Sequence, residues 1–173
     1  MIVLRLNHRP ERDKRITSHV CLVARAFGAE GVYISGIKDE NILKTINKIC
    51  ETWGGNFWIN FIENPLFLIR EWKKNGGIVV HLTMYGIPIS KILNSLDLEK
   101  DILVIVGSEK VPREYYYEAN YNIAIGNQPH SEVSALAIFL DRVTKGAWEY
   151  LKFQNAKLII IPSERGKKVH KVK

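Results

Sequence analysis

The chain has 173 residues, of which 46% are apolar and 25% are charged. These proportions are typical of one compact domain with a sizeable core, and they exclude a disordered tail. No apolar run approaches the roughly 18 residues that a membrane-spanning helix needs, and the N-terminal segment becomes basic too early for a secretory signal. We therefore expect a cytoplasmic protein that does not enter a membrane.

The excess positive charge lies entirely at the two ends of the chain. Residues 1–15 hold five basic and two acidic side chains, residues 164–173 hold five basic and one acidic, and residues 16–163 are balanced. Two basic ends on a neutral body indicate a polyanionic partner, although solvated ends without any partner have the same pattern. A membrane surface is less favoured, because neither end combines its charges with a broad apolar helical face.

Short apolar runs rich in β-branched residues alternate with longer segments of helical period. In chain order we predict strands at 2–6, 31–35, 56–62, 78–82, 102–106 and 121–125, and helices at 13–27, 39–53, 65–74, 88–96 and 131–145. This alternation is typical of βα units, so it predicts an α/β fold with a mainly parallel sheet flanked by helices. In the first helix an apolar stripe would comprise Ile16, Val20, Val23 and Phe27. Candidate N-caps are Asp13, Asp39 and Ser131.

The last part of the chain has a different pattern. In the segment KLIIIPSERGKKVHKV, an apolar run and a basic run that contains valine lie on either side of residues 162–166, which predicts a C-terminal β-hairpin. We therefore divide the chain into a main domain, 1–150, and a basic extension, 151–173. In the extension, Lys167, Lys168 and Lys171 are candidate RNA contacts.

Three predicted strands end in unusual loops, at residues 83–86, 107–112 and 126–131. Each loop has a glycine near the strand end, where the backbone can turn sharply and approach a flat ligand. Ligands of open α/β sheets bind beyond the carboxyl ends of strands, so these loops are candidates for one binding site. Any one of them alone is more simply a turn.

Several familiar signatures are absent. There is no GxGxxG after a strand and no GxxxxGK[ST], so neither a dinucleotide site nor a P-loop is supported. HExxH, CxxC and GxSxG are also absent, which argues against metal-dependent hydrolysis and serine acyl transfer. Cys21 and Cys50 have no paired spacing, so we expect two small buried apolar residues and no metal site.

The first helix carries part of the basic cluster. At about 100° per residue, Arg12, Arg15 and His19 lie beside the apolar stripe, where they would face a cleft. Arg15 could bind a phosphate, or in a desolvated setting assist removal of a ribose hydroxyl proton; the first role is chemically easier for a guanidinium. Alternatively, these residues are ion-paired or snorkelling at the border of the core.

Three long stretches resemble a known family. The segments LRLNHRPERDKRITSHVCLVARAFGAEGVYISG, VGSEKVP and NIAIGNQPHSEVSALAIFLDRV are similar to the three motif regions of the archaeal tRNA (cytidine(56)-2′-O)-methyltransferases, which belong to the SPOUT superfamily. The resemblance covers most of the chain. It implies a sheet whose C-terminal part is threaded through a loop into a deep trefoil knot, an exception to the rule that connections do not thread loops.

The resemblance also implies that S-adenosyl-L-methionine binds, bent, among the three loops. The residues implied as its contacts come from the ends of three strands: Leu82, Gly107, Ser108, Glu109, Lys110, Val111, Ile125, Gly126, Asn127, Gln128, Pro129, His130, Ser131 and Glu132. Most of these would contact the cofactor through backbone groups and apolar side chains, which explains why no charged signature marks the site.

The implied reaction is attack by a ribose 2′-oxygen on the sulfonium methyl group, with help in removing the hydroxyl proton. Related enzymes use an arginine near the first motif for this step, but the position counted back from Gly28 falls near Leu22 in this sequence. Arg15 lies on the same helical face two turns earlier and is our candidate catalytic residue. Arg9, Arg12 and His19 are the alternative candidates for the catalytic role and are also candidate RNA contacts.

Family members are generally homodimers. The helix predicted at 131–145 is apolar around much of its circumference, through Leu136, Ile138, Phe139 and Leu140, so part of it either forms a dimer interface or lies deeper in the core. The leading hypothesis is a homodimeric, metal-independent enzyme that uses S-adenosyl-L-methionine to methylate the ribose of cytidine 56 in the T-loop of tRNA. One alternative is another tRNA or rRNA nucleotide as the target; another is a non-catalytic RNA-binding module.

Overall fold

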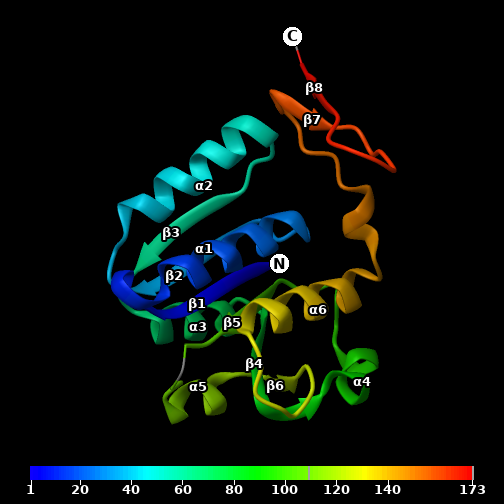
Figure 1. Ribbon diagram of the computed structural model, residues 1–173. Coiled ribbons are helices and arrows are strands. Elements are labelled where there is room, and N and C mark those ends of the chain that lie inside the picture. Colours follow the sequence, from blue (N-terminus) through cyan, green and yellow to red (C-terminus); the bar gives the residue numbers. More distant parts are fainter. Residues whose placement is uncertain (109, 173) are drawn as a thin grey trace.

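The computed structural model describes residues 1–108 and 110–172, and its elements alternate between strands and helices (Figure 1). Strands are β1 Ile2–His8, β2 Gly31–Gly36, β3 Trp58–Ile62, β4 Ile78–Pro88, β5 Ile102–Val106, β6 Tyr121–Ala124, β7 Leu158–Ile160 and β8 Val169–Lys171. Helices are α1 Pro10–Ala26, α2 Glu40–Trp53, α3 Pro65–Lys74, α4 Ile89–Ile92, α5 Arg113–Glu118 and α6 Glu132–Thr144, with short 3₁₀ turns η1 Leu93–Ser95 and η2 Ala147–Tyr150.

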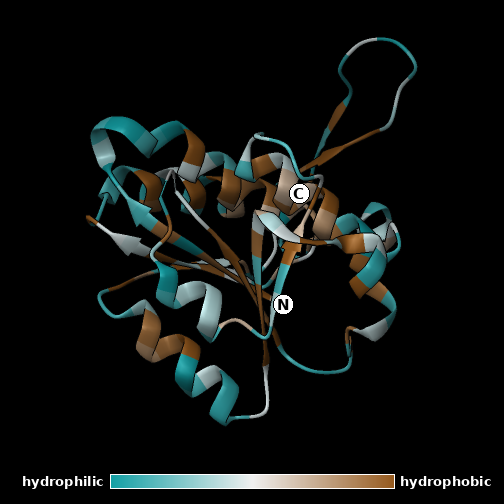
Figure 2. Cartoon of the chain, turned by 90° about the horizontal axis from the view of Figure 1, so that it is seen from below, coloured by the Kyte–Doolittle hydropathy of each residue, from teal (hydrophilic) through white to brown (hydrophobic). Residues whose placement is uncertain are grey.

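The first six strands form one parallel sheet in the order β3-β2-β1-β5-β4-β6. Its two faces bury separate apolar clusters, because successive side chains of a strand point to opposite faces. In β5, Val104 packs into the cluster beneath α1, α2 and α6, whereas Leu103 and Ile105 pack with α3 and α5 on the other face. Figure 2 shows these hydrophobic strands inside a more hydrophilic exterior. The predicted α/β fold with a mainly parallel sheet is therefore confirmed.

Most predicted elements occur close to their expected positions, and the exceptions concern β4, the region after it and α5. β4 continues past its predicted end because its last residues pair with β6. The helix predicted at 88–96 is divided into α4 and η1. Helix α5 was not predicted, because its six residues are too few to display a helical period.

The N-cap predictions are right for Asp39 and Ser131 and wrong for Asp13. Asp39 and Ser131 accept hydrogen bonds from the backbone N–H groups of Asn41 and Val133. Helix α1 instead begins at Pro10, whose fixed φ favours the first helical position, and Asp13 lies inside the helix. Its carboxylate accepts from both the backbone N–H and the guanidinium of Arg9.

The buried face of α1 is also rotated relative to the prediction. Val20 is buried, but Ile16, Val23 and Phe27 are only half-buried, and the polar residues Asp13 and Thr17 are buried instead. These polar side chains are tolerated because both have hydrogen-bond partners inside the protein.

Of the two cysteines, Cys21 is buried, and burial raises its thiol pKa to about 12. Cys50 is only half-buried, so the expectation of a fully buried residue is wrong for it. Its thiol lies 3.7 Å from the carbonyl oxygen of Phe57, near the border of the core.

Strands β7 and β8 form a separate antiparallel pair at the C-terminus. The segment before β7 passes the end of α2 and the start of β3. There the N–H group of Gly55 donates to the carbonyl oxygen of Gln154, and the N–H group of Lys157 donates to that of Thr52. Beyond these contacts the β7–β8 pair projects away from the sheet (Figure 1). Within residues 1–108 and 110–172, no helix has the length and apolarity that crossing a membrane requires.

Candidate active site

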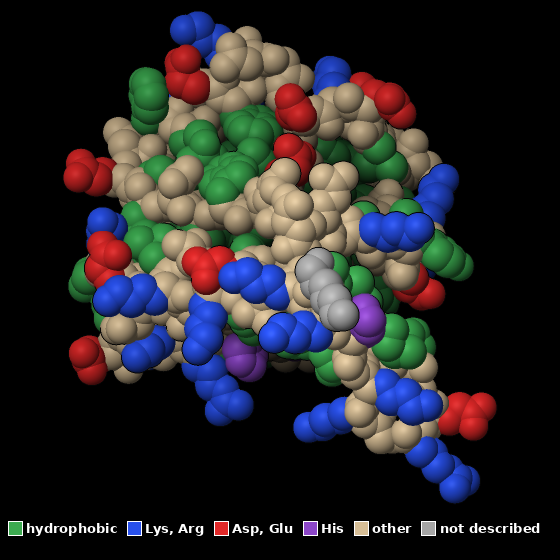
Figure 3. All heavy atoms as spheres, turned by 90° about the horizontal axis from the view of Figure 1, so that it is seen from above, with side chains coloured by type: hydrophobic (Ala, Val, Ile, Leu, Met, Phe, Trp, Pro, Cys, Tyr) green, Lys and Arg blue, Asp and Glu red, His purple; other side chains and the backbone are tan. Residues whose placement is uncertain are grey.

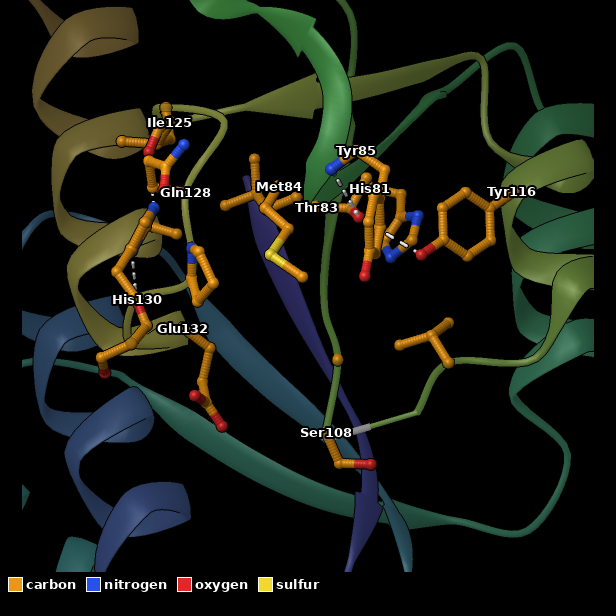
Figure 4. Close-up of a pocket in the computed structure, with 16 residues that line it drawn as sticks. His81, Thr83, Met84, Tyr85, Ser108, Tyr116, Ile125, Gln128, His130 and Glu132 are labelled. Atoms are coloured by element: carbon orange, nitrogen blue, oxygen red, sulfur yellow. Dashed lines mark hydrogen bonds between the residues drawn. The ribbon is translucent and has the colours of Figure 1, made fainter.

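Strand β4 and the loops after β5 and β6 converge on one cavity of about 390 Å³. These three strands are neighbours in the sheet and run parallel, so their carboxyl ends open at the same edge. The cavity is lined by His81, Leu82, Thr83, Met84, Tyr85, Gly107, Ser108, Val111, Tyr116, Ile125, Gln128, Pro129, His130, Ser131, Glu132 and Ala135. Figure 4 shows His81 and Tyr116 on one wall, Ile125, Gln128, His130 and Glu132 on the opposite wall, and Met84 between them.

Hydrogen bonds hold the loop after β6 against the irregular second half of β4. The side-chain amide of Asn127 donates to the carbonyl oxygens of Met84 and Gly86, at 2.8 and 3.0 Å. The two ring nitrogens of His130 lie 2.5 Å from the carbonyl oxygen of Ile125 and 3.1 Å from that of Ser131. Asn127 and His130 therefore shape this wall of the cavity through the backbone.

The loop after β5 requires glycine at its first position. A Cβ on Gly107 would lie 2.2 Å from a methyl carbon of Val111, which folds back over it. The Gly107 carbonyl oxygen accepts a hydrogen bond from the guanidinium of Arg5. The loop is thus closely packed on one side and lines the cavity on the other.

His81 is a buried polar group in the cavity wall. Its Nδ1 lies 2.9 Å from Oδ1 of Asn122, whose amide nitrogen donates to the carbonyl oxygen of Tyr116. This orientation of the amide makes Nδ1 the donor, and within residues 1–108 and 110–172 no group is hydrogen-bonded to Nε2. Burial lowers the pKa of His81, so the imidazole is neutral and its Nε2 lone pair lies unused beside the cavity.

The acidic side chain among the lining residues is Glu132, in the first turn of α6. Its Oε1 lies 3.2 Å from a guanidinium nitrogen of Arg5, and about a third of the side chain is exposed. Arg5 itself is buried in β1. We did not predict a role for Arg5 from the sequence, although a single arginine within the apolar run IVLRL was a usable signal.

Most residues implied as cofactor contacts line this cavity: Leu82, Gly107, Ser108, Val111, Ile125, Gln128, Pro129, His130, Ser131 and Glu132. Lys110, Gly126 and Asn127 do not line it, and Glu109 lies outside the described residues. Thr83, Met84 and Tyr85 also line it, and they belong to the stretch 83–86 that the sequence indicated as part of the site. Lining residues that the sequence did not indicate are His81, Tyr116 and Ala135.

The predicted RNA-contacting residues lie elsewhere. Arg12, Arg15 and His19 are on the outer part of α1 and Arg9 directly precedes the helix. None of the four lines the cavity of its own chain. Arg9 is ion-paired with Asp13 at 2.8 Å. Lys167, Lys168 and Lys171 are exposed on the C-terminal strand pair, and Figure 3 shows Lys and Arg side chains gathered on that projection.

The apolar residues of α6 divide between core and surface. Leu136, Phe139 and Leu140 are fully buried in the core between α6 and the sheet, whereas Ile138 is 43% exposed. Within the described part of the chain, no group of three or more His, Cys, Asp or Glu side chains could hold a metal ion.

Comparisons with known proteins agree with this geometry. Residues 53–170 match the family described as "tRNA ribose 2'-O-methyltransferase, aTrm56". A tRNA (cytidine(56)-2'-O)-methyltransferase of Sulfurisphaera tokodaii is 61% identical over 168 residues, which cover 96% of this chain and 99% of the relative.

Solved structures share the fold at low sequence identity. The TrmH/SpoU tRNA modifying enzyme of A. aeolicus has a TM-score of 0.62 at 20% identity, covering 86% of this chain and 76% of that one. The SpoU methyltransferase AviRb of Streptomyces viridochromogenes, solved with the cofactor AdoMet, has a TM-score of 0.59 at 17% identity, covering 84% of this chain and 57% of that one.

The buried histidines predict a stability that depends on pH. Burial lowers the pKa values of His81 and His8, so the unfolded chain binds protons that the folded chain excludes. The resulting stability is present in full above about pH 6.5 and declines as the pH falls below that value, by up to about 1.4 kcal/mol per pH unit for each histidine. Urea unfolding at pH 7.5, 6.5 and 5.5 measures this slope.

Two variants separate His81 from other groups. His81→Gln should flatten the pH slope, and His170→Gln, at an exposed position of β8, should leave it unchanged. An identical slope in the wild type and His81→Gln would refute the assignment of a neutral, buried His81.

Proposed function

The chain belongs to the tRNA ribose 2′-O-methyltransferase family, and we propose that it uses S-adenosyl-L-methionine to methylate the ribose 2′-oxygen of cytidine 56 in the T-loop of tRNA. The observation that carries the proposal is the 61% identity, over almost the full length of both chains, to a relative named tRNA (cytidine(56)-2'-O)-methyltransferase. The cavity at the ends of β4, β5 and β6 supports it, because ligands of parallel sheets bind at this edge.

The cavity fits the proposed cofactor in size and lining. Its volume of about 390 Å³ lies within the range of small-molecule sites. Leu82, Val111 and Ile125 offer apolar surface for an adenine ring, and the missing Cβ of Gly107 lets Val111 fold back over the loop. The unused Nε2 lone pair of His81 would accept a hydrogen bond from an amine or hydroxyl group of the ligand. AviRb, of the same fold, was solved with AdoMet. The cofactor supplies the electrophilic methyl group.

The chain's own task is to align the ribose oxygen with that methyl group and to help remove the hydroxyl proton. We propose that Arg15 contacts the reacting nucleotide and that Arg9, Arg12 and His19 bind neighbouring phosphates. Because α1 contributes no residue to the cavity of its own chain, this assignment requires the RNA, or a second copy of the chain, to bring the two together.

A trefoil knot is part of the proposal. It has support in the double pairing of β4 with β6: β6 pairs with residues 80–82 and again with residues 87 and 88. Between these pairings, a Cβ on Gly86 would lie 2.5 Å from the backbone of Asn122. We propose that the segment from β6 to α6 passes through the loop that joins β4 to β5. A crystal structure in which residues 125–131 ran outside that loop would contradict the knot.

We also propose that residues 1–150 form the catalytic domain and residues 151–173 an RNA-binding β-hairpin extension, and that the enzyme acts in the cytoplasm without a metal ion. Basic side chains on a projecting strand pair are suited to phosphate contacts.

The reaction can be tested directly. Wild-type protein incubated with unmodified tRNA and methyl-labelled S-adenosyl-L-methionine should transfer label to the 2′-oxygen of cytidine 56. A matched tRNA with 2′-deoxycytidine at that position should remain unlabelled. Label at another tRNA or rRNA nucleotide would replace the substrate assignment. Absence of both transfer and cofactor binding would leave a non-catalytic RNA-binding module.

Arg15→Ala should lower turnover about 100- to 10,000-fold, the range for loss of a group that assists proton transfer. Cofactor affinity measured by calorimetry should stay within about twofold. Lys14→Ala, at the neighbouring exposed position, is the matched control and should retain activity. Unchanged turnover in Arg15→Ala would eliminate Arg15 from the reaction.

Replacing Lys167, Lys168 and Lys171 by Gln should weaken tRNA binding and flatten its salt dependence. The slope of log affinity against log salt should fall by about 0.7–0.9 for each phosphate that the variant no longer neutralises. Replacing Lys74, Lys91 and Lys100, which are exposed elsewhere, is the control for a general change of charge. Equal slopes in the wild type and the hairpin variant would show that the hairpin binds no phosphate.

A homodimer is supported by apolar side chains that the single chain leaves exposed, including Ile138 of α6 and Ile160 of β7, which is 65% exposed. Sedimentation should give twice the mass of the 19.9 kDa chain for the wild type and a smaller species for Ile138→Glu. Asn47→Glu, at an exposed position of α2, serves as the control. A wild-type protein that sediments as a monomer at micromolar concentration would rule out the dimer.

A further inference from the structure

Arg5 occupies a position where a charge is costly. It lies in β1, between β2 and β5 in the sheet, and its side chain is only 1% exposed. Moving a guanidinium out of water costs several kcal/mol, and even a paired buried charge is often no more stabilising than an apolar residue of the same size. A leucine would fit the apolar pattern of this strand, so the energetic cost of Arg5 calls for a role other than stability.

The contacts of Arg5 reach both sides of the candidate cofactor cavity. One terminal nitrogen donates to the carbonyl oxygen of Gly107, the first residue after β5. The other lies 3.2 Å from Oε1 of Glu132, in the first turn of α6. Gly107 and Glu132 both line the cavity, whereas Arg5 lies behind it. A single rigid guanidinium therefore spans two segments that are far apart in the sequence.

A second set of contacts fixes Arg5 from the side away from the cavity. Its Nε lies 3.5 Å from Oγ1 of Thr17, and that oxygen lies 2.9 Å from Nδ1 of His8. Because Nε–H can only donate, the Thr17 oxygen accepts from Arg5 and its hydroxyl hydrogen is available to His8. The His8 Nε2–H then faces Asp39, 3.7 Å away. All four side chains are buried.

We propose that Arg5 is a positioning residue for methyl transfer: it holds the Gly107 carbonyl and the Glu132 carboxylate at a fixed separation and so sets the width of the cofactor cavity. The inference rests on the proposed function, since it takes S-adenosyl-L-methionine as the ligand. The planar fork of arginine suits this task because its donors have a fixed geometry, and lysine would present a single point charge. We call Arg5, with its contacts to Gly107 and Glu132, the clamp. Because small displacements of reacting groups lower the reaction rate by large factors, the clamp affects turnover as well as cofactor binding.

The test is Arg5→Lys, which keeps the charge and removes the fork. Calorimetric titration with S-adenosyl-L-methionine should give a dissociation constant about 10- to 100-fold higher than that of the wild type, the loss expected for charge-assisted hydrogen bonds. In the methylation assay, KM for the cofactor should rise and kcat should fall as well.

Arg25→Lys is the matched control. Arg25 is also buried, at 8% exposure, and donates to two carbonyl oxygens, those of Trp53 and Gly54. These lie near the amino ends of the strands, at the opposite edge of the sheet from the cavity. The variant should lose comparable thermal stability, and its cofactor affinity should stay within about twofold of the wild type.

Thr17→Val provides a second variant that keeps the shape of the side chain and removes the acceptor of Arg5 Nε. It should weaken cofactor binding about 2- to 10-fold, and the Arg5→Lys/Thr17→Val double variant should bind no more weakly than Arg5→Lys alone, because both changes disrupt the same clamp. If Arg5→Lys does not fold, Thr17→Val decides the question.

Two results would overturn this proposal. The first is cofactor binding within twofold of the wild type in Arg5→Lys, or in Thr17→Val if Arg5→Lys does not fold. The second is a loss of affinity in Arg25→Lys equal to that in Arg5→Lys. Failure of the wild type to bind S-adenosyl-L-methionine is a different outcome. It would refute the proposed function, and the clamp would then have no such ligand to position.

Discussion

Strand β4 holds the site together because it has partners on both sides. It pairs with β5 along one edge and with β6 along the other, all in parallel, so the three following loops open at one end of the sheet. An irregularity between Leu82 and Ile87 lets β4 bend and pair with β6 a second time. Gly86 lies in that bend, where any side chain would collide with the backbone of β6. The cavity therefore depends on strand pairing rather than on the loops' own conformations.

The electrostatic arrangement separates the interior from the surface. The buried Arg5 is paired with Glu132, and the buried Arg25 donates to the carbonyl oxygens of Trp53 and Gly54. Asp13, also buried, is paired with the half-exposed Arg9 at the border of the core. Burial keeps His81 neutral at the cavity wall. The basic residues proposed to bind RNA are carried by the outer part of α1 and by the β7–β8 pair. The cavity that we propose for the cofactor and the basic residues that we propose for RNA thus lie on different parts of the molecule.

The sequence was sufficient for elements whose signal is local. Continuous apolar runs predicted the buried strands, and the predicted loops after residues 106 and 125 line the cavity. Residues 83–86 also lie at the cavity, but they belong to β4 and are not a loop, because β4 continues to pair with β6. Asp13 was mistaken for an N-cap because Pro10 starts the helix earlier and the aspartate is needed to pair with Arg9. His81 and Tyr116 were missed since their place beside the cavity depends on strand order. The sequence shows Arg5 as the one charged residue in the apolar run IVLRL. Its burial, however, depends on the position of β1 between β2 and β5, and this position is determined by contacts between residues far apart in the sequence.

The same pairings define what the cavity can do in the reaction. Both ring nitrogens of His130 lie against carbonyl oxygens, and one oxygen of Glu132 is held by Arg5. The lining residues are therefore arranged to hold a ligand in a fixed shape. Arg15 lies on α1 and does not line this cavity, so its proposed contact with the reacting nucleotide requires the RNA or a second copy of the chain to bring the two together. If the RNA has to bring the ribose to the cavity, methyl transfer is favoured only when the correct nucleotide is bound there.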